Sequence, residues 1–266
     1  MNITHPINFA IIGDSAAFGI GDFDKYGNCR GWGYHLAKAF SAPLVYINVS
    51  RPGAKTVEVR QVQLEKVLPL RPHITAVIVG GNDVLRNDFD PFRIHQNIRE
   101  ITRILTEANS EVLLLQLHDA TRIIPMPALL ARVLRRRVNL LNAISESIAK
   151  EFNAIFLQTR NIDDLYNKKF WHVDRMHPSS LGHQLLAREY RDLLVKRNWM
   201  IEPIGVEPTA TLARRDSFLW LLLHGTPWLI KRSVDLLPAM AYLCFLEAMS
   251  ILRRRPDKDP EVTRFS

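Results

Sequence analysis

The sequence predicts an α/β protein with a five-stranded parallel sheet that is covered by helices on both faces. Three observations lead to this prediction: five short apolar runs, stretches of helical periodicity between them, and glycine-containing turns directly after three of the runs. Buried strands that alternate with helices are typical of a parallel sheet with helices on both faces. In such folds ligands bind at the carboxyl ends of the strands, where these turns lie.

The predicted strands are short segments rich in Ile, Val and Leu. They lack the polar–apolar alternation of a half-exposed strand, so we expect each of them to be buried on both faces. In chain order they are residues 9–12, 44–49, 74–79, 112–117 and 154–157.

The predicted helices have apolar residues at helical spacing and lie between and after the strands. Pro91 favours the start of one helix and Pro69 favours the end of another. In chain order the helices are residues 32–40, 57–68, 91–105, 128–152 and 180–195.

The composition changes after Trp199, which indicates a second region. Residues 202–208 are rich in Pro and Gly, as is typical of a linker, and two apolar stretches at 218–230 and 234–252 follow before a charged tail. We therefore predict an α/β domain over residues 1–202 and an amphipathic helical C-terminal extension with a charged tail over residues 203–266.

Three placements of this extension stay open. It caps the α/β domain, it lies on a membrane surface with Trp220 and Trp228 at the interface, or it spans a membrane. Asp235 and Glu247 fall inside the longer apolar stretch and disfavour spanning, because charged groups are costly in a bilayer.

The composition is that of a folded protein, with 47% hydrophobic residues, 23% charged residues and a net charge of +8. A basic balance suits nucleic acid, anionic lipid or an anionic substrate, and we expect no nucleic-acid partner because no such motif is present. Cys29 and Cys244 are isolated in the sequence, which argues against a disulfide framework and against a metal site. The first apolar run is too short for a secretory signal. We therefore expect a cytoplasmic protein, peripheral at the membrane if the extension contacts lipid.

The residues Gly13-Asp14-Ser15 end the first predicted strand. A serine at such a strand-to-helix turn is held above the sheet, and its backbone N–H can face an anion. The same tripeptide is typical of a turn in which Asp14 or Ser15 caps a helix. Taken alone, this turn therefore leaves both interpretations open.

Two further turns carry candidate donors for an oxyanion. Gly53 follows the second strand and, without a side chain, lets its backbone N–H come close to a ligand. Asn82 lies in the Gly80-Gly81-Asn82-Asp83 turn after the third strand and can offer its amide to a developing negative charge. We expect Asp83 to cap a turn or to tie loops together.

The last turn places Asp174 three residues before His177. A carboxylate at that spacing can reach the Nδ1–H of the histidine and fix its tautomer. Taken alone, His177 is also typical of a loop before a helix that Ser179 or Ser180 caps. Together the four turns supply a nucleophile, extra oxyanion donors, a base and an orienting acid.

These four blocks resemble those of the SGNH hydrolase family, also called GDSL esterases and lipases, over about residues 7–198. The blocks FAIIGDSAAFGIGD, NVSRPGAKT, GGND and DRMHPSSLGH stand in the family's order, and four blocks in order are highly specific. The first block has Ala16 where the family name has leucine, a common variation that puts nothing catalytic in doubt. The resemblance implies a flavodoxin-like three-layer α/β/α sandwich.

The resemblance also implies the roles of the site residues. Ser15, Asp174 and His177 would form a catalytic triad, and the Ser15 N–H, the Gly53 N–H and the Asn82 side chain would form the oxyanion hole. The implied activity is hydrolysis of carboxylic esters, of lipids or acylated sugars, through an acyl-enzyme and without a metal or cofactor. Acyl transfer from the same acyl-enzyme and a non-catalytic membrane-associated module are the alternatives.

Weaker features surround these blocks. His118 follows the fourth strand and His172 precedes the last block, and we predict that both bind substrate as pocket-lining residues. Several arginines fall in a stretch without acidic residues between Asp119 and Glu146, and they form either a solvated helix face or an electropositive rim for an anionic ester. They are Arg122, Arg132, Arg135, Arg136 and Arg137.

Overall fold

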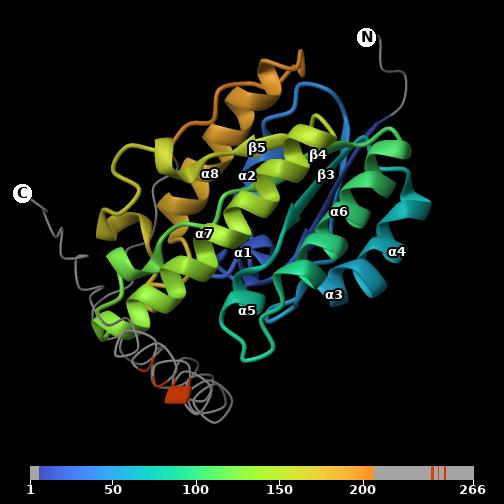
Figure 1. Cartoon of the computed structure of the whole chain (residues 1–266). Coiled ribbons are helices and arrows are strands. Elements are labelled where there is room, and N and C mark those ends of the chain that lie inside the picture. Colours follow the sequence, from blue (N-terminus) through green and yellow to red (C-terminus); the bar gives the residue numbers. More distant parts are fainter. Residues whose placement is uncertain (1–5, 207–240, 243–244, 246–248, 250–266) are drawn as a thin grey trace, which may run out of the picture.

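A computed structural model of the chain describes residues 6–206, 241, 242, 245 and 249. Its centre is a five-stranded parallel sheet with the strand order β2-β1-β3-β4-β5, and helices cover both faces of this sheet (Figure 1). The predicted fold class is therefore confirmed. The strands are β1 (Ile7–Gly13), β2 (Leu44–Asn48), β3 (Ile74–Ile78), β4 (Glu111–Leu115) and β5 (Ile155–Leu157).

The predicted helices are also present. Predicted helix 57–68 belongs to an uninterrupted helical run from α3 to η2, in which η1 is a π-helical turn. That run consists of α3 (Thr56–Glu58), η1 (Val59–Gln63), α4 (Leu64–Val67) and η2 (Leu68–Leu70), and it is followed along the chain by α5 (Gly81–Val84), α6 (Pro91–Glu107) and α7 (Ala128–Glu151). The remaining ones are α1 (Ser15–Phe18), α2 (Gly31–Lys38), η3 (Ala120–Arg122), η4 (Thr159–Asn161), η5 (Lys168–Phe170) and α8 (Ser180–Val195).

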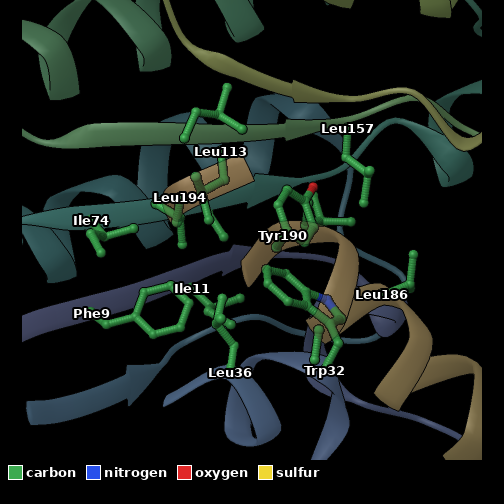
Figure 2. Packing of buried hydrophobic residues seen from close by; sticks show 14 of the residues in the cluster. Phe9, Ile11, Trp32, Leu36, Ile74, Leu113, Leu157, Leu186, Tyr190 and Leu194 are labelled. Atoms are coloured by element: carbon green, nitrogen blue, oxygen red, sulfur yellow. The ribbon is translucent and has the colours of Figure 1, made fainter. Parts of the chain in front are cut away.

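One face of the sheet packs against α2 and α8 (Figure 2). Tyr190 of α8 stacks on Trp32 of α2 with ring centroids 4.6 Å apart, and its hydroxyl donates to the Leu114 carbonyl at 2.9 Å. Buried Tyr hydroxyls usually have such a partner. The opposite face of the sheet packs against α6, α7 and the helical run that begins with α3. Helices thus cover both broad faces of the sheet. A ligand can therefore reach the sheet only at the ends of its strands, and the turns with candidate site residues lie at the carboxyl ends.

The expectation that every strand is buried on both faces is wrong for β2. This strand pairs only with β1 and forms one edge of the sheet, and its Val45 is 43% exposed. An edge strand has a neighbour on one side only, so its side chains receive less cover than those of β1 and β3.

The strand order determines where a ligand site can form. The chain runs outward from β1 to β2 and then returns to the other side of β1 for β3. The carboxyl ends of β1 and β3 therefore lie where the connections diverge, which is the usual ligand position in this type of sheet.

The predicted extension, with Trp220, Trp228, Asp235 and Glu247, lies outside the described residues apart from residues 203–206 and the four positions from 241 to 249. Its helical structure and the division of the chain at residue 202 stay predictions. Among the helices that the structure describes, none has both the length and the apolar character needed to cross a bilayer.

Candidate active site

The nucleophile candidate Ser15 stands at the junction of β1 and α1. β1 ends at Gly13, whose φ is +147°, and a Cβ atom at this position would lie 2.0 Å from the Ile78 carbonyl oxygen. Only glycine allows this close approach of β1 and β3. Asp14 then caps α1, because its Oδ1 accepts the Ala16 N–H at 3.0 Å. The predicted capping role of Asp14 is therefore confirmed, and the half-buried Ser15 begins α1 directly after it.

Gln63 holds the residue before this turn from the side of the π-helical turn η1. Its Oε1 accepts the Gly13 N–H at 2.7 Å, and its Nε2 donates to the Gly13 carbonyl at 3.0 Å. The Arg51 N–H also donates to that carbonyl at 3.0 Å. Gln63 is not among the site residues predicted from the sequence. Its spacing of four residues from both Val59 and Val67, on the buried side of the helical run, was the available signal.

His177 and Asp174 lie in the loop that precedes α8. His177 Nε2 is 2.7 Å from Ser15 Oγ, and His177 Nδ1 is 2.8 Å from Asp174 Oδ2. Asp174 Oδ1 accepts the backbone N–H of Met176 at 2.9 Å and that of His177 at 3.1 Å. Arg175 between them has a φ of +59°, the left-handed conformation that closes the loop. The structure thus brings together the three side chains that the sequence pointed to.

Two carboxyl groups near Ser15 have opposite electrostatic environments. Burial raises the pKa of Asp14 to about 6 from its ordinary 3.8, although the Ala16 N–H partly opposes this. Burial alone would also raise the pKa of Asp174, but contacts with the His172 and His177 side chains outweigh it and hold this pKa well below its usual range. Asp174 is therefore ionised at every pH where a histidine can act as a base.

The two remaining turns lie beside Ser15. The loop after β2 is tied to the end of β1 by the Arg51 N–H, and Gly53 within it has a φ of +85°. Asn82 in α5 donates from Nδ2 to the Ala54 carbonyl at 3.2 Å, which fixes its amide next to this loop. Within residues 6–206, no group accepts the N–H of Ser15 or of Gly53.

Asp83 ties these two turns together, as predicted. Its Oδ1 accepts the Thr56 hydroxyl at 2.7 Å, and its carboxylate also accepts the Thr56 N–H. Because Thr56 begins α3 and Asp83 lies in α5, this contact fixes the loop after β2 against the loop after β3. Donors from three loops are therefore held at the carboxyl ends of three neighbouring strands, beside a serine that is paired with a histidine.

Comparison with protein families gives a match for this chain. The model of the GDSL-like Lipase/Acylhydrolase family matches residues 11–185, which is well over half of the chain. The chain belongs to this family. Its resemblance to SGNH hydrolases is thereby confirmed, and the protein is a carboxylic ester hydrolase of the GDSL type. Among curated protein sequences, no significant match is found.

Solved structures of esterases share this fold. The esterase EstA from Pseudoalteromonas sp. has a TM-score of 0.56 at 18% identity, over 72% of this chain and 98% of that one. The acetylxylan esterase Axe2 from Geobacillus stearothermophilus has a TM-score of 0.57 at 19% identity, over 80% of this chain and 100% of that one. A lipase/acylhydrolase from Enterococcus faecalis has a TM-score of 0.57 at 16% identity, over 75% of this chain and 100% of that one. At these identities the likeness concerns the fold alone.

The two histidines expected to bind substrate take different positions in this GDSL hydrolase. The ring of His118 packs on Trp171 with centroids 4.1 Å apart, and its Nε2 is buried without a hydrogen-bond partner among the described residues. Burial lowers the pKa of His118 to about 4, so its ring is neutral near pH 7. His172 is only 5% exposed, and its Nδ1 lies 3.3 Å from Asp174 Oδ2.

One arginine of the predicted rim lies inside the protein, whereas the other four are exposed. Arg137 is buried and donates to the carbonyls of Val84 and Arg86 at 2.9 and 2.7 Å, so both placements proposed for it are wrong. Arg135 pairs with Asp119 at 3.0 Å. Arg137 was misplaced because five guanidinium donors can satisfy buried carbonyls, a use that sequence patterns do not reveal. A separate contact places the Arg122 guanidinium 3.7 Å above the Tyr166 ring.

A buried polar network behind the site was also missed. Asp22 is fully buried and accepts from His35 Nε2 at 2.7 Å, from Arg30 Nη2 at 2.9 Å and from the Gly31 N–H at 3.2 Å. His183 of α8 is fully buried nearby and contacts the Ile20 carbonyl through Nε2 at 2.9 Å. The network therefore fixes the loop after α1 against α2 and α8. In the described part of the chain, no group of three or more His, Cys, Asp or Glu side chains is arranged to hold a metal ion.

Proposed function

We propose that this GDSL hydrolase uses Ser15 as its nucleophile, His177 as general base and Asp174 as the group that orients His177. The observation that carries the proposal is the chain of contacts from Asp174 Oδ2 through His177 to Ser15 Oγ, at 2.8 and 2.7 Å. Because the ionised carboxylate keeps the proton on Nδ1, Nε2 is free to accept the Ser15 hydroxyl proton.

The oxyanion forms when Ser15 attacks the ester carbonyl. We assign its three donors to the Ser15 N–H, the Gly53 N–H and the Asn82 side chain. The geometry supports this assignment because neither backbone N–H has an acceptor within residues 6–206, and Asn82 uses only one of its two amide hydrogens on Ala54. Donors fixed in advance stabilise the charge as it develops.

The second half of the reaction uses the same groups in reverse. Protonated His177 gives its proton to the departing alcohol, and Ser15 is left as an acyl-enzyme. His177 then removes a proton from water, which attacks the acyl group and regenerates Ser15. None of these steps requires a metal or an organic cofactor. Another acceptor could replace water in the second step, and product analysis in the presence of added alcohols separates hydrolysis from transfer.

For the substrate we propose a small-molecule ester of a lipid or of an acylated sugar. The proteins of similar fold support this range, since they include an acetylxylan esterase and a lipase/acylhydrolase. His118 fits a substrate-binding role because its neutral ring borders Trp171 and keeps a buried Nε2 without a partner among the described residues. This neutral nitrogen can bond a polar atom of the ester once the side chains that cover it move aside.

We also propose that residues 203–266 form a separate extension that contacts a membrane surface or caps the acyl site of a cytoplasmic enzyme. The sequence supports this through its two apolar stretches and the basic residues that flank them. A chain of residues 1–206 that is shown to be folded should keep its short-chain esterase activity. If the extension contacts a membrane, this shorter chain should no longer sediment with anionic liposomes. If the extension caps the acyl site, the shorter chain should lose activity on long-chain esters. Unchanged behaviour in both assays would remove this role.

The Ser15→Ala variant tests the assignment of the nucleophile. Hydrolysis of a short-chain chromogenic ester should lose on the order of 10³-fold or more in kcat, because the covalent route is removed. Circular dichroism should match that of the native protein, since Ser15 belongs to neither hydrophobic cluster of the core. Near-native turnover by the purified variant would refute the assignment.

A further inference from the structure

The loop from residue 171 to residue 178 brings two histidines to Asp174. The His172 N–H donates to the His177 carbonyl at 2.8 Å, and Trp171 forms an antiparallel bridge with Pro178, so the two histidines face each other across the loop. His177 Nδ1 is 2.8 Å from Asp174 Oδ2, and His172 Nδ1 is 3.3 Å from the same oxygen. One carboxylate oxygen therefore faces two imidazole nitrogens.

This arrangement occupies the whole accepting capacity of Asp174. Its Oδ1 takes the backbone N–H groups of Met176 and His177 at 2.9 and 3.1 Å, while Oδ2 faces the two rings. An ionised carboxylate has about four acceptor positions, so all of them are directed at groups of this one loop. The contact with His172 is favourable only if its Nδ1 carries the proton, because an unprotonated nitrogen would repel the oxygen.

His172 is also held in place from its other side. Its ring makes a T-shaped contact with the Phe23 ring at a centroid distance of 6.3 Å. A Cβ atom on Gly21 would lie 3.2 Å from the His172 Cβ and 2.0 Å from the Pro178 carbonyl oxygen, so the loop after α1 packs directly on this segment. With 5% exposure, the side chain of His172 has little freedom to turn toward solvent.

We propose that His172 is a positioning residue, whose Nδ1–H fixes Asp174 Oδ2 and thereby keeps His177 aimed at Ser15. It acts through Asp174 and touches no reacting atom. Rotation of the carboxylate would break its bond to His177 Nδ1, and a second donor on Oδ2 opposes that rotation. This inference rests on the proposed function of the Ser15–His177–Asp174 group, and it replaces the substrate-lining role expected for His172 from the sequence.

Three substitutions of His172 distinguish the effect of its hydrogen-bond donor from the effect of its side-chain volume. Asparagine places an amide nitrogen where the imidazole Nδ1 stands, leucine has similar branching without a donor, and glutamine carries its amide one bond further out. We expect His172→Leu to lower kcat by roughly 3- to 10-fold with KM unchanged, the effect of one moderate hydrogen bond. His172→Asn should recover most of this loss, and His172→Gln should not. If His172→Leu does not fold, the kcat values of His172→Asn and His172→Gln still test the proposal, because only the Asn variant should approach the native value.

Nuclear magnetic resonance of the full chain provides a chemical shift that would stay unchanged if His172 only supported the fold. The low-field resonance of the His177 Nδ1 proton should shift in His172→Leu and return in His172→Asn, with equal thermal unfolding of the two. Equal kcat in the Asn and Gln variants would overturn the proposal, as would a change confined to KM that grows with acyl length. The wild-type protein and Ser15→Ala are assayed in parallel, because turnover independent of Ser15 refutes the proposed function itself.

Discussion

Asp14 offers a test of the electrostatics around the nucleophile turn. This residue is 6% exposed, and burial raises the pKa of its carboxyl group to about 6 from the ordinary 3.8. The folded protein therefore holds the Asp14 proton at a pH where the unfolded chain has released it. Stability falls as pH rises wherever the folded state binds more protons, so the destabilisation by Asp14 is absent below pH 3.8 and complete above about pH 6.

The Asp14→Asn substitution removes this ionisation and keeps the shape of the side chain. The amide oxygen can still accept the Ala16 N–H that Asp14 Oδ1 accepts at 3.0 Å, so the cap on α1 is preserved. The difference between the two pKa values corresponds to about 3 kcal/mol at 1.36 kcal/mol per pH unit. Part of this effect is already present at pH 4, where the unfolded chain has begun to lose the proton. Relative to the native protein, the variant should therefore gain about 2.5 kcal/mol of unfolding free energy between about pH 4 and about pH 7.5.

The assay is urea unfolding of both proteins at these two pH values, followed by tryptophan fluorescence. The quantity to compare is the change with pH in the free-energy difference between variant and native protein, because any pH-independent effect of the amide itself cancels. The two proteins share every other titrating group, so this change reports on the Asp14 carboxyl. A difference that stays constant from the acid to the neutral measurement would refute the buried, high-pKa carboxyl at Asp14.

Three further predictions concern the groups around Ser15. Asn82→Ala should lower kcat by about 10²–10³-fold with little change in KM, as measured by steady-state ester hydrolysis, and a change in KM alone would contradict an oxyanion role. Gln63→Leu should cost about 1–3 kcal/mol of unfolding free energy in urea, because it leaves the buried Gly13 N–H without an acceptor and removes one of the two donors to the Gly13 carbonyl, and a loss below about 0.5 kcal/mol would contradict this. Gly21→Ala should lower both the melting temperature and kcat, because its Cβ would lie 2.0 Å from the Pro178 carbonyl oxygen, and native-like values of both would show that the two loops separate freely.

The parts of the site that follow strands were predictable from the sequence. Ser15, Gly53 and Asn82 closely follow apolar runs, and parallel strands bring such turns to one edge of the sheet. Asp174 and His177 are three residues apart, so their contact depends only on one local loop. Short-range patterns and the alternation of strands and helices were sufficient to place these residues, whereas the roles expected of them came from the family resemblance.

The residues that were missed or misplaced depend on contacts between distant segments. Gln63 reaches Gly13 across 50 positions of the chain, and Arg137 reaches Val84 across 53. From the sequence alone, polar side chains such as these are expected to be exposed to solvent. Only the structure shows that each forms hydrogen bonds with buried backbone groups. The contact of His172 Nδ1 with Asp174 Oδ2 at 3.3 Å was likewise not predicted, because it depends on the fold of the loop between them.

The most direct test of the account is the site of modification by a fluorophosphonate. This reagent is attacked by an activated serine and leaves a stable phosphonyl group on its oxygen. After treatment of the full chain near neutral pH, peptide mass mapping should find one adduct on Ser15, at close to one per chain, and none in Ser15→Ala. An untouched Ser15 in folded, ester-hydrolysing protein, or an adduct on another residue that persists in Ser15→Ala, would contradict the central claim that His177 makes Ser15 the nucleophile.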